Sequence, residues 1–103
     1  MQLPLFGVEM DSGDITLFEK LSDAESYIES YDIDTWQVFD SAGGMCKIEP
    51  GKIEPMVKIT TEESIEIRQL MPIIGKFLAR PSTAGSKIEA EIRKVLMLVD
   101  KSK

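Results

Sequence analysis

Short apolar segments separated by turn-forming residues constrain the fold of this chain most. Residues 3–9 and 15–19 are rich in apolar side chains and flank Asp11-Ser12-Gly13-Asp14, where the glycine can adopt a positive φ. This pattern predicts a β-hairpin. Residues 36–39 and 45–49 carry strand-favouring side chains on either side of a glycine-containing loop, and they predict a second pair of strands.

Two prolines mark the segment that follows. Lys47-Ile48-Glu49-Pro50-Gly51 is followed directly by the near repeat Lys52-Ile53-Glu54-Pro55-Met56. Glu49-Pro50-Gly51-Lys52 predicts a type II turn, with proline at the second position and glycine at the third. Residues 56–59 would then form another strand. Because proline cannot donate to a β-ladder, we expect this part of the sheet to be an edge or a strand end.

An amphipathic helix is predicted between the two pairs of strands. Ser22 and Glu25, three residues apart, have the pattern of a capping box, and acids in the first turn suit the helix dipole. The spacing predicts a helix over residues 23–30. Its apolar face would carry Ala24, Tyr27, Ile28 and Tyr31.

The segment after Thr60 allows two interpretations. Thr60 and Glu63 can cap a helix whose apolar stripe contains Pro72, which would kink or divide it. Alternatively, residues 64–68 alternate as a strand does, and the helix begins near Gln69. The sequence leaves both possibilities open.

The last helix is predicted from a second capping box, Ser86 with Glu89, followed by apolar residues at helical spacing. The element order is then strand, strand, helix, three strands, helix, helix. We therefore expect residues 1–103 to form a single α+β domain. Its antiparallel meander sheet would have four or five strands, with the helices packed on one face.

Charge is divided unevenly along the chain. Residues 1–46 hold ten acids and one base, whereas residues 47–103 hold eight acids and eleven bases. The first part therefore carries a net charge of −9 and the second +3, within a total of −6. Such a field repels nucleic acid and favours a cationic partner.

Missing residue types weaken several classes of enzyme. The chain has no histidine, which excludes Ser-His-Asp triads, Cys-His pairs and histidine-based zinc sites. The single cysteine, Cys46, cannot form an internal disulfide; we interpret it as a buried structural thiol in a reducing, cytoplasmic compartment. The longest apolar run, Val95–Val99, is too short to span a membrane. We predict no catalytic residue, metal site or cofactor.

Part of the sequence is similar to a group of small, mostly uncharacterised bacterial proteins. Ile15 to Ile28, Asp32-Ile33 and Trp36 to Gly43 carry the similarity. The group has a strand ending in Phe-Glu-Ser, a helix of the Ala-Glu-x-Tyr-Leu type, an Asp-Val pair, and a strand leading into an Asp-Ala-x-Gly turn. Some such acidic domains resemble immunity proteins that accompany polymorphic toxins. The resemblance implies partner binding and no catalytic motif.

These observations favour a non-enzymatic protein-binding module. The leading hypothesis is an immunity protein that occludes a basic toxin such as a nuclease, with carboxylates in place of substrate phosphates. The alternative is a small regulatory or ligand-binding dimeric domain that uses its apolar C-terminal helix. Neither nucleic acid nor a membrane is expected as a partner. The candidate contact residues are the carboxylates Asp11, Asp14, Asp32, Asp34 and Asp40, with Trp36 or Tyr31 as the apolar anchor.

Overall fold

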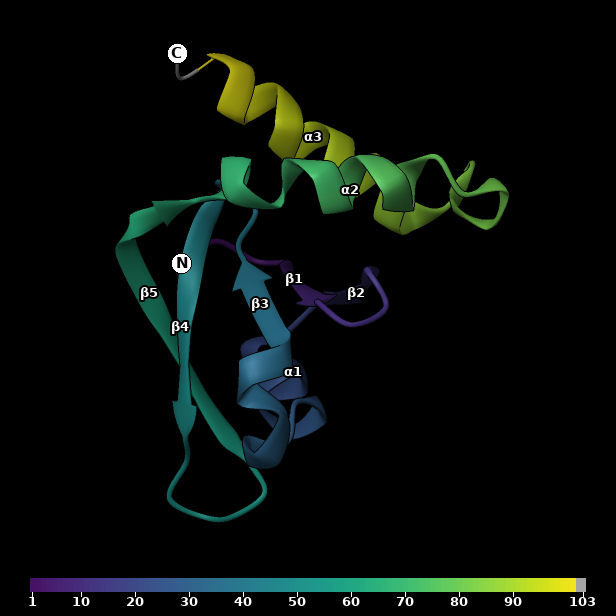
Figure 1. Cartoon of the computed structure of the whole chain (residues 1–103). Helices are drawn as coiled ribbons and strands as arrows, with labels where there is room; N and C mark the ends of the chain where they lie inside the picture. The colour runs from purple at the N-terminus through teal and green to yellow at the C-terminus, as the bar shows by residue number, and fades with distance from the viewer. Residues whose placement is uncertain (102–103) are drawn as a thin grey trace.

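A five-stranded antiparallel sheet forms the centre of the computed structural model, shown in Figure 1. The structure describes residues 1–101, without the side chains of residues 62–66 and 101. The α+β class and the meander sheet agree with the prediction. In spatial order the strands are β2 (Asp14–Phe18), β1 (Leu5–Glu9), β3 (Trp36–Phe39), β4 (Gly44–Pro50) and β5 (Val57–Glu66).

The first hairpin is confirmed, and its turn uses the expected glycine. Gly13 has a φ of 75° and donates its N–H to the carbonyl of Glu9 at 2.7 Å. Few residues other than glycine adopt this left-handed conformation without strain. The resulting register pairs Val8 with Ile15 and Phe6 with Leu17, which places these apolar side chains on one face of the sheet.

The connection between β4 and β5 differs from the predicted type II turn. Gly51 is not among the glycines with positive φ, and that turn requires a positive φ at its third position. Instead β4 continues to Pro50, which pairs with Val57, and Gly51 donates its N–H to the carbonyl of Met56 at 2.9 Å. The proline therefore ends a strand, as expected, but the turn is replaced by a loop over residues 51–56.

β5 is an edge strand that extends further than the predicted residues 56–59. Thr60 pairs with Lys47 of β4, so it does not cap a helix, and the strand continues to Glu66. The alternative of a strand in this region is therefore correct as far as Glu66. A 3₁₀ turn, η2 (Ile67–Leu70), follows it.

Two helices cover one face of the sheet. Pro72 does not kink a long helix, because it lies in the first turn of α2 (Met71–Leu78), where its missing N–H has no partner to lose. A 3₁₀ turn, η3 (Pro81–Thr83), leads to α3 (Lys87–Lys101), and Ser86 accepts the N–H of Glu89 at 3.2 Å as predicted. No helix in the described part of the chain is long and apolar enough to cross a membrane. The core between the sheet and these two helices contains Phe6, Phe39, Met45, Ile74, Phe77, Ile92 and Val95.

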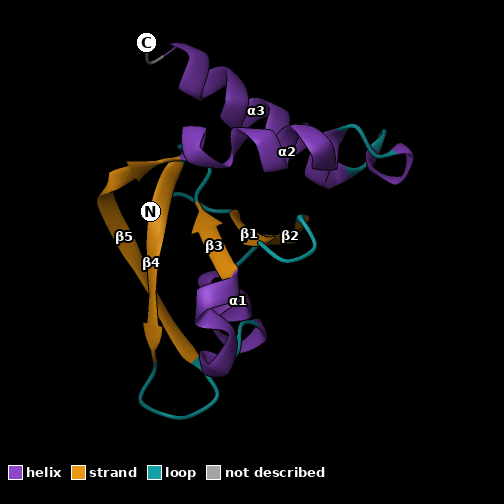
Figure 2. Ribbon diagram, viewed as in Figure 1, coloured by secondary structure: helices purple, strands orange, loops and turns teal. Residues whose placement is uncertain are grey.

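The opposite face is covered by α1 (Leu21–Tyr27) and the 3₁₀ turn η1 (Ser30–Thr35), so the prediction that all helices pack on one face is wrong. Figure 2 shows α2 and α3 together, well separated from α1. Adjacent strand residues point to opposite faces, and β1 carries large apolar residues at both Leu5 and Phe6. Both faces of the sheet must therefore be buried by other elements of the chain. This second core contains Leu5, Phe18, Ala24, Ile28, Val38, Cys46, Val57 and Ile59.

The predicted capping box of α1 does not form. The residue at the N-cap position is Lys20, and no side chain caps the helix. Glu25 instead reaches across to the sheet, where its Oε2 accepts the N–H of Ile59 at 2.9 Å. This bond satisfies an edge-strand amide that β4 leaves unpaired.

Gly7, in the middle of β1, allows two aromatic rings to lie over the strand. A Cβ at this position would lie 2.8 Å from the ring of Phe18 and 2.9 Å from that of Trp36. We predict that Gly7→Ala lowers the free energy of unfolding by about 1–3 kcal/mol, because both rings must move. Denaturant titration measures the change.

Gly75 provides the control for this prediction. It lies within α2, and a Cβ there would meet nothing within 4 Å. Gly75→Ala should therefore leave stability unchanged or raise it by about 0.5–1 kcal/mol. Equal effects of the two substitutions would show that the rings over β1 tolerate a methyl group.

Asp40 organises the β3–β4 hairpin. Only 4% of this residue is exposed, and its carboxylate accepts the backbone N–H groups of Gln2, Ala42 and Gly44 at 3.1, 3.0 and 2.9 Å. We predict that Asp40→Ala lowers the free energy of unfolding by about 1–3 kcal/mol, because three amides lose their acceptor. Asp40→Asn keeps one acceptor oxygen and should cost less. Thermal or chemical denaturation of both variants tests this order.

Candidate functional site

A hollow of about 450 Å³ lies where α1 and η1 meet the ends of β1 and β3. Four of its lining residues are acids and two are aromatic, and none is a lysine or arginine. We refer to it as the acidic hollow. Its lining residues are Glu9, Asp11, Tyr27, Glu29, Asp32, Thr35 and Trp36.

Backbone pairing brings these residues together from distant parts of the sequence. Glu9 pairs with Trp36 at the end of the β1–β3 ladder. Just beyond it, Met10 donates its N–H to the carbonyl of Thr35 at 2.7 Å, which attaches η1 to the turn that carries Asp11. The hollow therefore depends on the pairing of β1 with β3.

Aromatic packing forms one wall of the acidic hollow. The rings of Tyr27 and Trp36 meet edge to face, with centroids 5.9 Å apart and planes at 89°, and Tyr27 also contacts Phe18 with centroids 5.4 Å apart. Tyr27 is nevertheless 60% exposed. An exposed ring held by two others offers a rigid surface on which an organic cation can pack.

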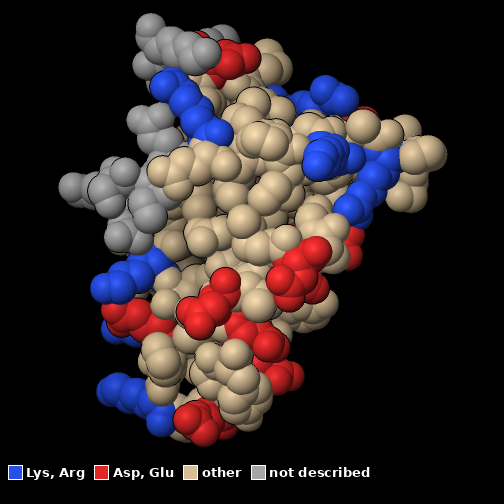
Figure 3. Space-filling view, viewed as in Figure 1, with Lys and Arg blue, Asp and Glu red and all other residues tan. Residues whose placement is uncertain are grey.

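The carboxylates of the acidic hollow make no ion pair with any described residue. Elsewhere acids are paired: Arg80 binds Asp14, Lys87 binds Glu19, and Lys47 binds Glu49 at 2.8 Å. On the face of the molecule seen in Figure 3, most of the acids lie over the half that holds α1. Unpaired carboxylates close together repel one another, so a bound cation would relieve that repulsion.

Three of the seven predicted contact residues, Asp11, Asp32 and Trp36, line the acidic hollow together. Tyr31 lies on η1 and is 68% exposed, but it is not part of the lining. Asp34 lines a separate hollow of about 300 Å³, which also has Trp36 in its lining. The structure thus brings together part of the predicted set.

Asp14 and Asp40 have other roles in the structure. The Arg80 guanidinium, which binds Asp14, lowers the pKa of that carboxyl, and a hydrogen bond with Ser12 acts in the same direction. Asp14 therefore favours folding above the ordinary carboxyl pKa, and this contribution is lost as the pH falls through the lowered value. The prediction that Asp40 contacts a partner is wrong, because its carboxylate is buried and holds the hairpin amides.

Four residues of the acidic hollow were not among the predicted contact residues: Glu9, Tyr27, Glu29 and Thr35. Tyr27 fits the apolar face of the predicted helix, and Glu29 fits a solvated face, so neither pattern suggested a shared site. Glu9 lies on β1, and no local sequence pattern identifies β3 as the strand that pairs with β1. The alternation of Glu9 and Asp11 at the end of β1 is the one local signal of a carboxylate pair on the same side.

Cys46 is a structural thiol. It is buried on the α1 face of the sheet, and burial raises its pKa to about 11, with the nearby charge of Asp40 acting in the same direction. Since the thiolate is the reactive form, only about one thiol in a thousand is ionised at pH 8. Among the described residues, no group of three potential ligands could hold a metal ion.

We predict that Cys46 in the native protein reacts very slowly with a thiol reagent such as 5,5′-dithiobis(2-nitrobenzoate) at pH 8. Unfolding exposes the thiol and returns its pKa towards the ordinary value, so the rate in denaturant should rise by at least about a hundredfold. Absorbance of the released thiolate measures both rates. Fast labelling of the native protein would contradict the assigned burial.

Comparison with known proteins gives no relative from which to transfer a function. No family model matches the chain, and neither the curated proteins nor the solved structures contain a match.

Proposed function

We propose that this protein is a non-enzymatic binding module whose acidic hollow occludes a basic surface of another protein. The leading candidate for the partner is a basic toxin, such as a nuclease, so the module would act as an immunity protein. The observation that carries this proposal is the group of four carboxylates, none ion-paired with a described residue, around the exposed Tyr27 and the partly buried Trp36.

The arrangement suits a lysine or arginine side chain of the partner. Such a side chain can place its aliphatic stem and cationic group against the rings of Tyr27 and Trp36 while the carboxylates surround the charge. In a nuclease, basic residues bind substrate phosphates. A carboxylate surface that takes the place of those phosphates would therefore block substrate directly.

The internal ion pairs strengthen this interpretation. The basic C-terminal part of the chain neutralises acids on β2 and just after it, through Arg80 with Asp14 and Lys87 with Glu19. The acids of the hollow receive no such neutralisation from the described residues. The negative field that remains is therefore concentrated around α1 and η1, where it can steer a basic partner into contact.

A regulatory dimer is the second candidate, because Met97 and Leu98 are exposed next to each other on α3. Leu96 and Val99 pack on the core and would not reach a partner. The experiment below separates the two candidates, since a dimer recovers its own chain.

The test is recovery of the tagged protein's partner from its host at low salt, followed by elution in a salt gradient. We predict a basic protein that elutes only at raised salt. The variant Asp11→Lys with Asp32→Lys should lower the affinity for it by about ten- to a hundredfold, since it places positive charge inside the hollow. Binding is then measured with the purified partner.

The matched control reverses two exposed acids outside the hollow, Asp23→Lys with Glu54→Lys, and so changes the net charge equally. This control should lower the affinity by less than about threefold. Equal losses in both double variants would show that only the overall charge matters. Recovery of no basic partner, or of the same chain alone, would overturn the proposal.

A further inference from the structure

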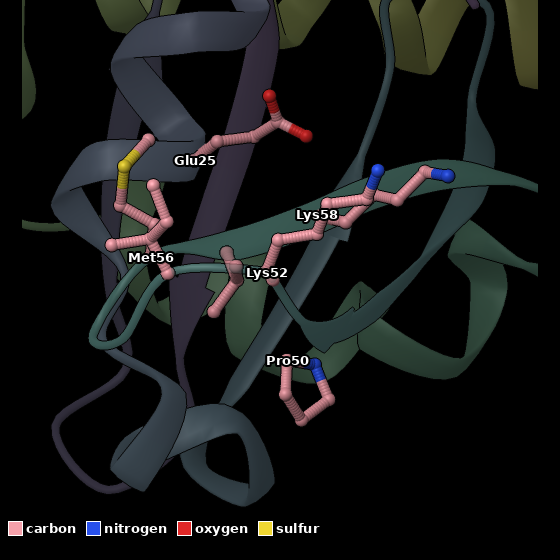
Figure 4. Close-up of a pocket in the computed structure, with 8 residues that line it drawn as sticks. Glu25, Pro50, Lys52, Met56 and Lys58 are labelled. Atoms are coloured by element: carbon pink, nitrogen blue, oxygen red, sulfur yellow. The ribbon is translucent and has the colours of Figure 1, made fainter.

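A second pocket, of about 520 Å³, lies between α1 and the loop that joins β4 to β5 (Figure 4). We refer to it as the loop pocket. It is lined by residues of the loop over 51–56, the adjoining ends of β4 and β5, and Glu25 of α1. It shares no lining residue with the acidic hollow, so what it binds can be tested separately.

Exposed apolar side chains form much of the loop pocket. Ile53 is 73% exposed and Met56 is 43% exposed, and both line the pocket beside the buried Val57. Leaving this much aliphatic surface in water is unfavourable, and exposed apolar surface of this kind in a concave site is typical of a ligand site.

Backbone hydrogen bonds hold the loop in this position. Met56 donates its N–H to the carbonyl of Ile53 at 2.9 Å, and Gly51 donates to the carbonyl of Met56 at the same distance. The carbonyl of Pro55 accepts the N–H of Ser30 at 2.8 Å, which attaches the loop to η1. The apolar side chains are thus part of a preformed wall of the pocket.

Two lysines place positive charge beside this apolar surface. Lys52 and Lys58 both line the pocket, and Figure 4 shows their ammonium groups extending to the same side of it. Neither makes an ion pair with a described residue. Lys58 lies opposite Glu49 in the ladder, but Glu49 binds Lys47.

Glu25 is the acid that lines the loop pocket. Its Oε2 accepts the N–H of Ile59 at 2.9 Å, so this oxygen is held towards β5. Two ammonium groups against one engaged carboxylate leave the lining with a net positive charge. The pocket therefore combines aliphatic surface with positive charge, the opposite of the acidic hollow.

We propose that the loop pocket binds a free amphipathic anion: a carboxylate carried by an aliphatic chain of medium length. The chain would cover Ile53, Met56 and Val57, and the carboxylate would accept hydrogen bonds from Lys52 and Lys58. The volume of the pocket lies within the range of small-molecule sites. A medium-chain fatty acid has this chemistry.

Titration of the ¹⁵N-labelled protein with decanoate, below the critical micelle concentration of decanoate, tests this proposal. Amide signals of residues 51–58 should shift and saturate. Decanol, which has the same chain without the charge, should bind about tenfold more weakly. Decyltrimethylammonium, which has the opposite charge, should produce no saturable shift at residues 51–58.

Variants separate the two parts of the site. Lys52→Ala with Lys58→Ala should weaken decanoate binding by about tenfold and leave decanol binding unchanged. Ile53→Ser should weaken the binding of both compounds. The control, Lys20→Ala with Lys76→Ala, removes two exposed lysines outside the pocket and should change neither.

The proposal would be overturned by the lack of a saturable shift with decanoate, by equal binding of decanoate and decanol, or by equal losses in the two double-lysine variants. Binding to phosphatidylglycerol vesicles without any response to monomeric decanoate would also overturn it. In that case the loop would be a contact with a lipid surface. Each result is independent of the acidic hollow, because the variants leave its residues intact.

Discussion

The pairing of β1 with β3 across Gly7 is the constraint on which the rest of this structure depends. On one face, the pairing stacks Phe6 on Phe39, with ring centroids 4.8 Å apart, and creates the surface that α2 and α3 cover. On the other face, the missing side chain of Gly7 leaves room for Phe18 and Trp36, on which Tyr27 packs. One strand pair therefore sets both cores and the aromatic wall of the acidic hollow.

The fold determines which acids of the unevenly charged chain are paired with cations. Acids on β2 and just after it meet cations from the α2–α3 region, so part of the negative charge is neutralised internally. These exposed pairs add little stability, but they determine which acids are engaged. The acids around η1 and the end of β1 make no ion pair with a described residue, and the proposed partner contact rests on them.

The short helix α1 contributes to both proposed sites. Glu25 and Tyr27 are two residues apart and therefore point to different sides of the helix. Glu25 faces β5 and borders the loop pocket, whereas Tyr27 faces Trp36 and borders the acidic hollow. The acidic hollow and the loop pocket have linings of opposite charge. The side of the sheet that α1 covers therefore presents one surface suited to cations and another suited to amphipathic anions.

Local interactions are what the sequence by itself determined: the first hairpin with Gly13, the β3–β4 pair, the cap of α3 by Ser86, the α+β class, and the buried thiol of Cys46. Only the tertiary structure decided the remainder, because distant groups took the place of local partners. Ile59 engages Glu25 in place of a capping box, and Thr60 pairs with Lys47, although one of the two interpretations of the sequence had Thr60 capping a helix. The acidic hollow also depends on residues that are distant in the sequence. Asp11, Asp32 and Trp36 could be named as candidates, but their meeting with Glu9, Tyr27 and Glu29 depends on a strand pairing that no local pattern encodes.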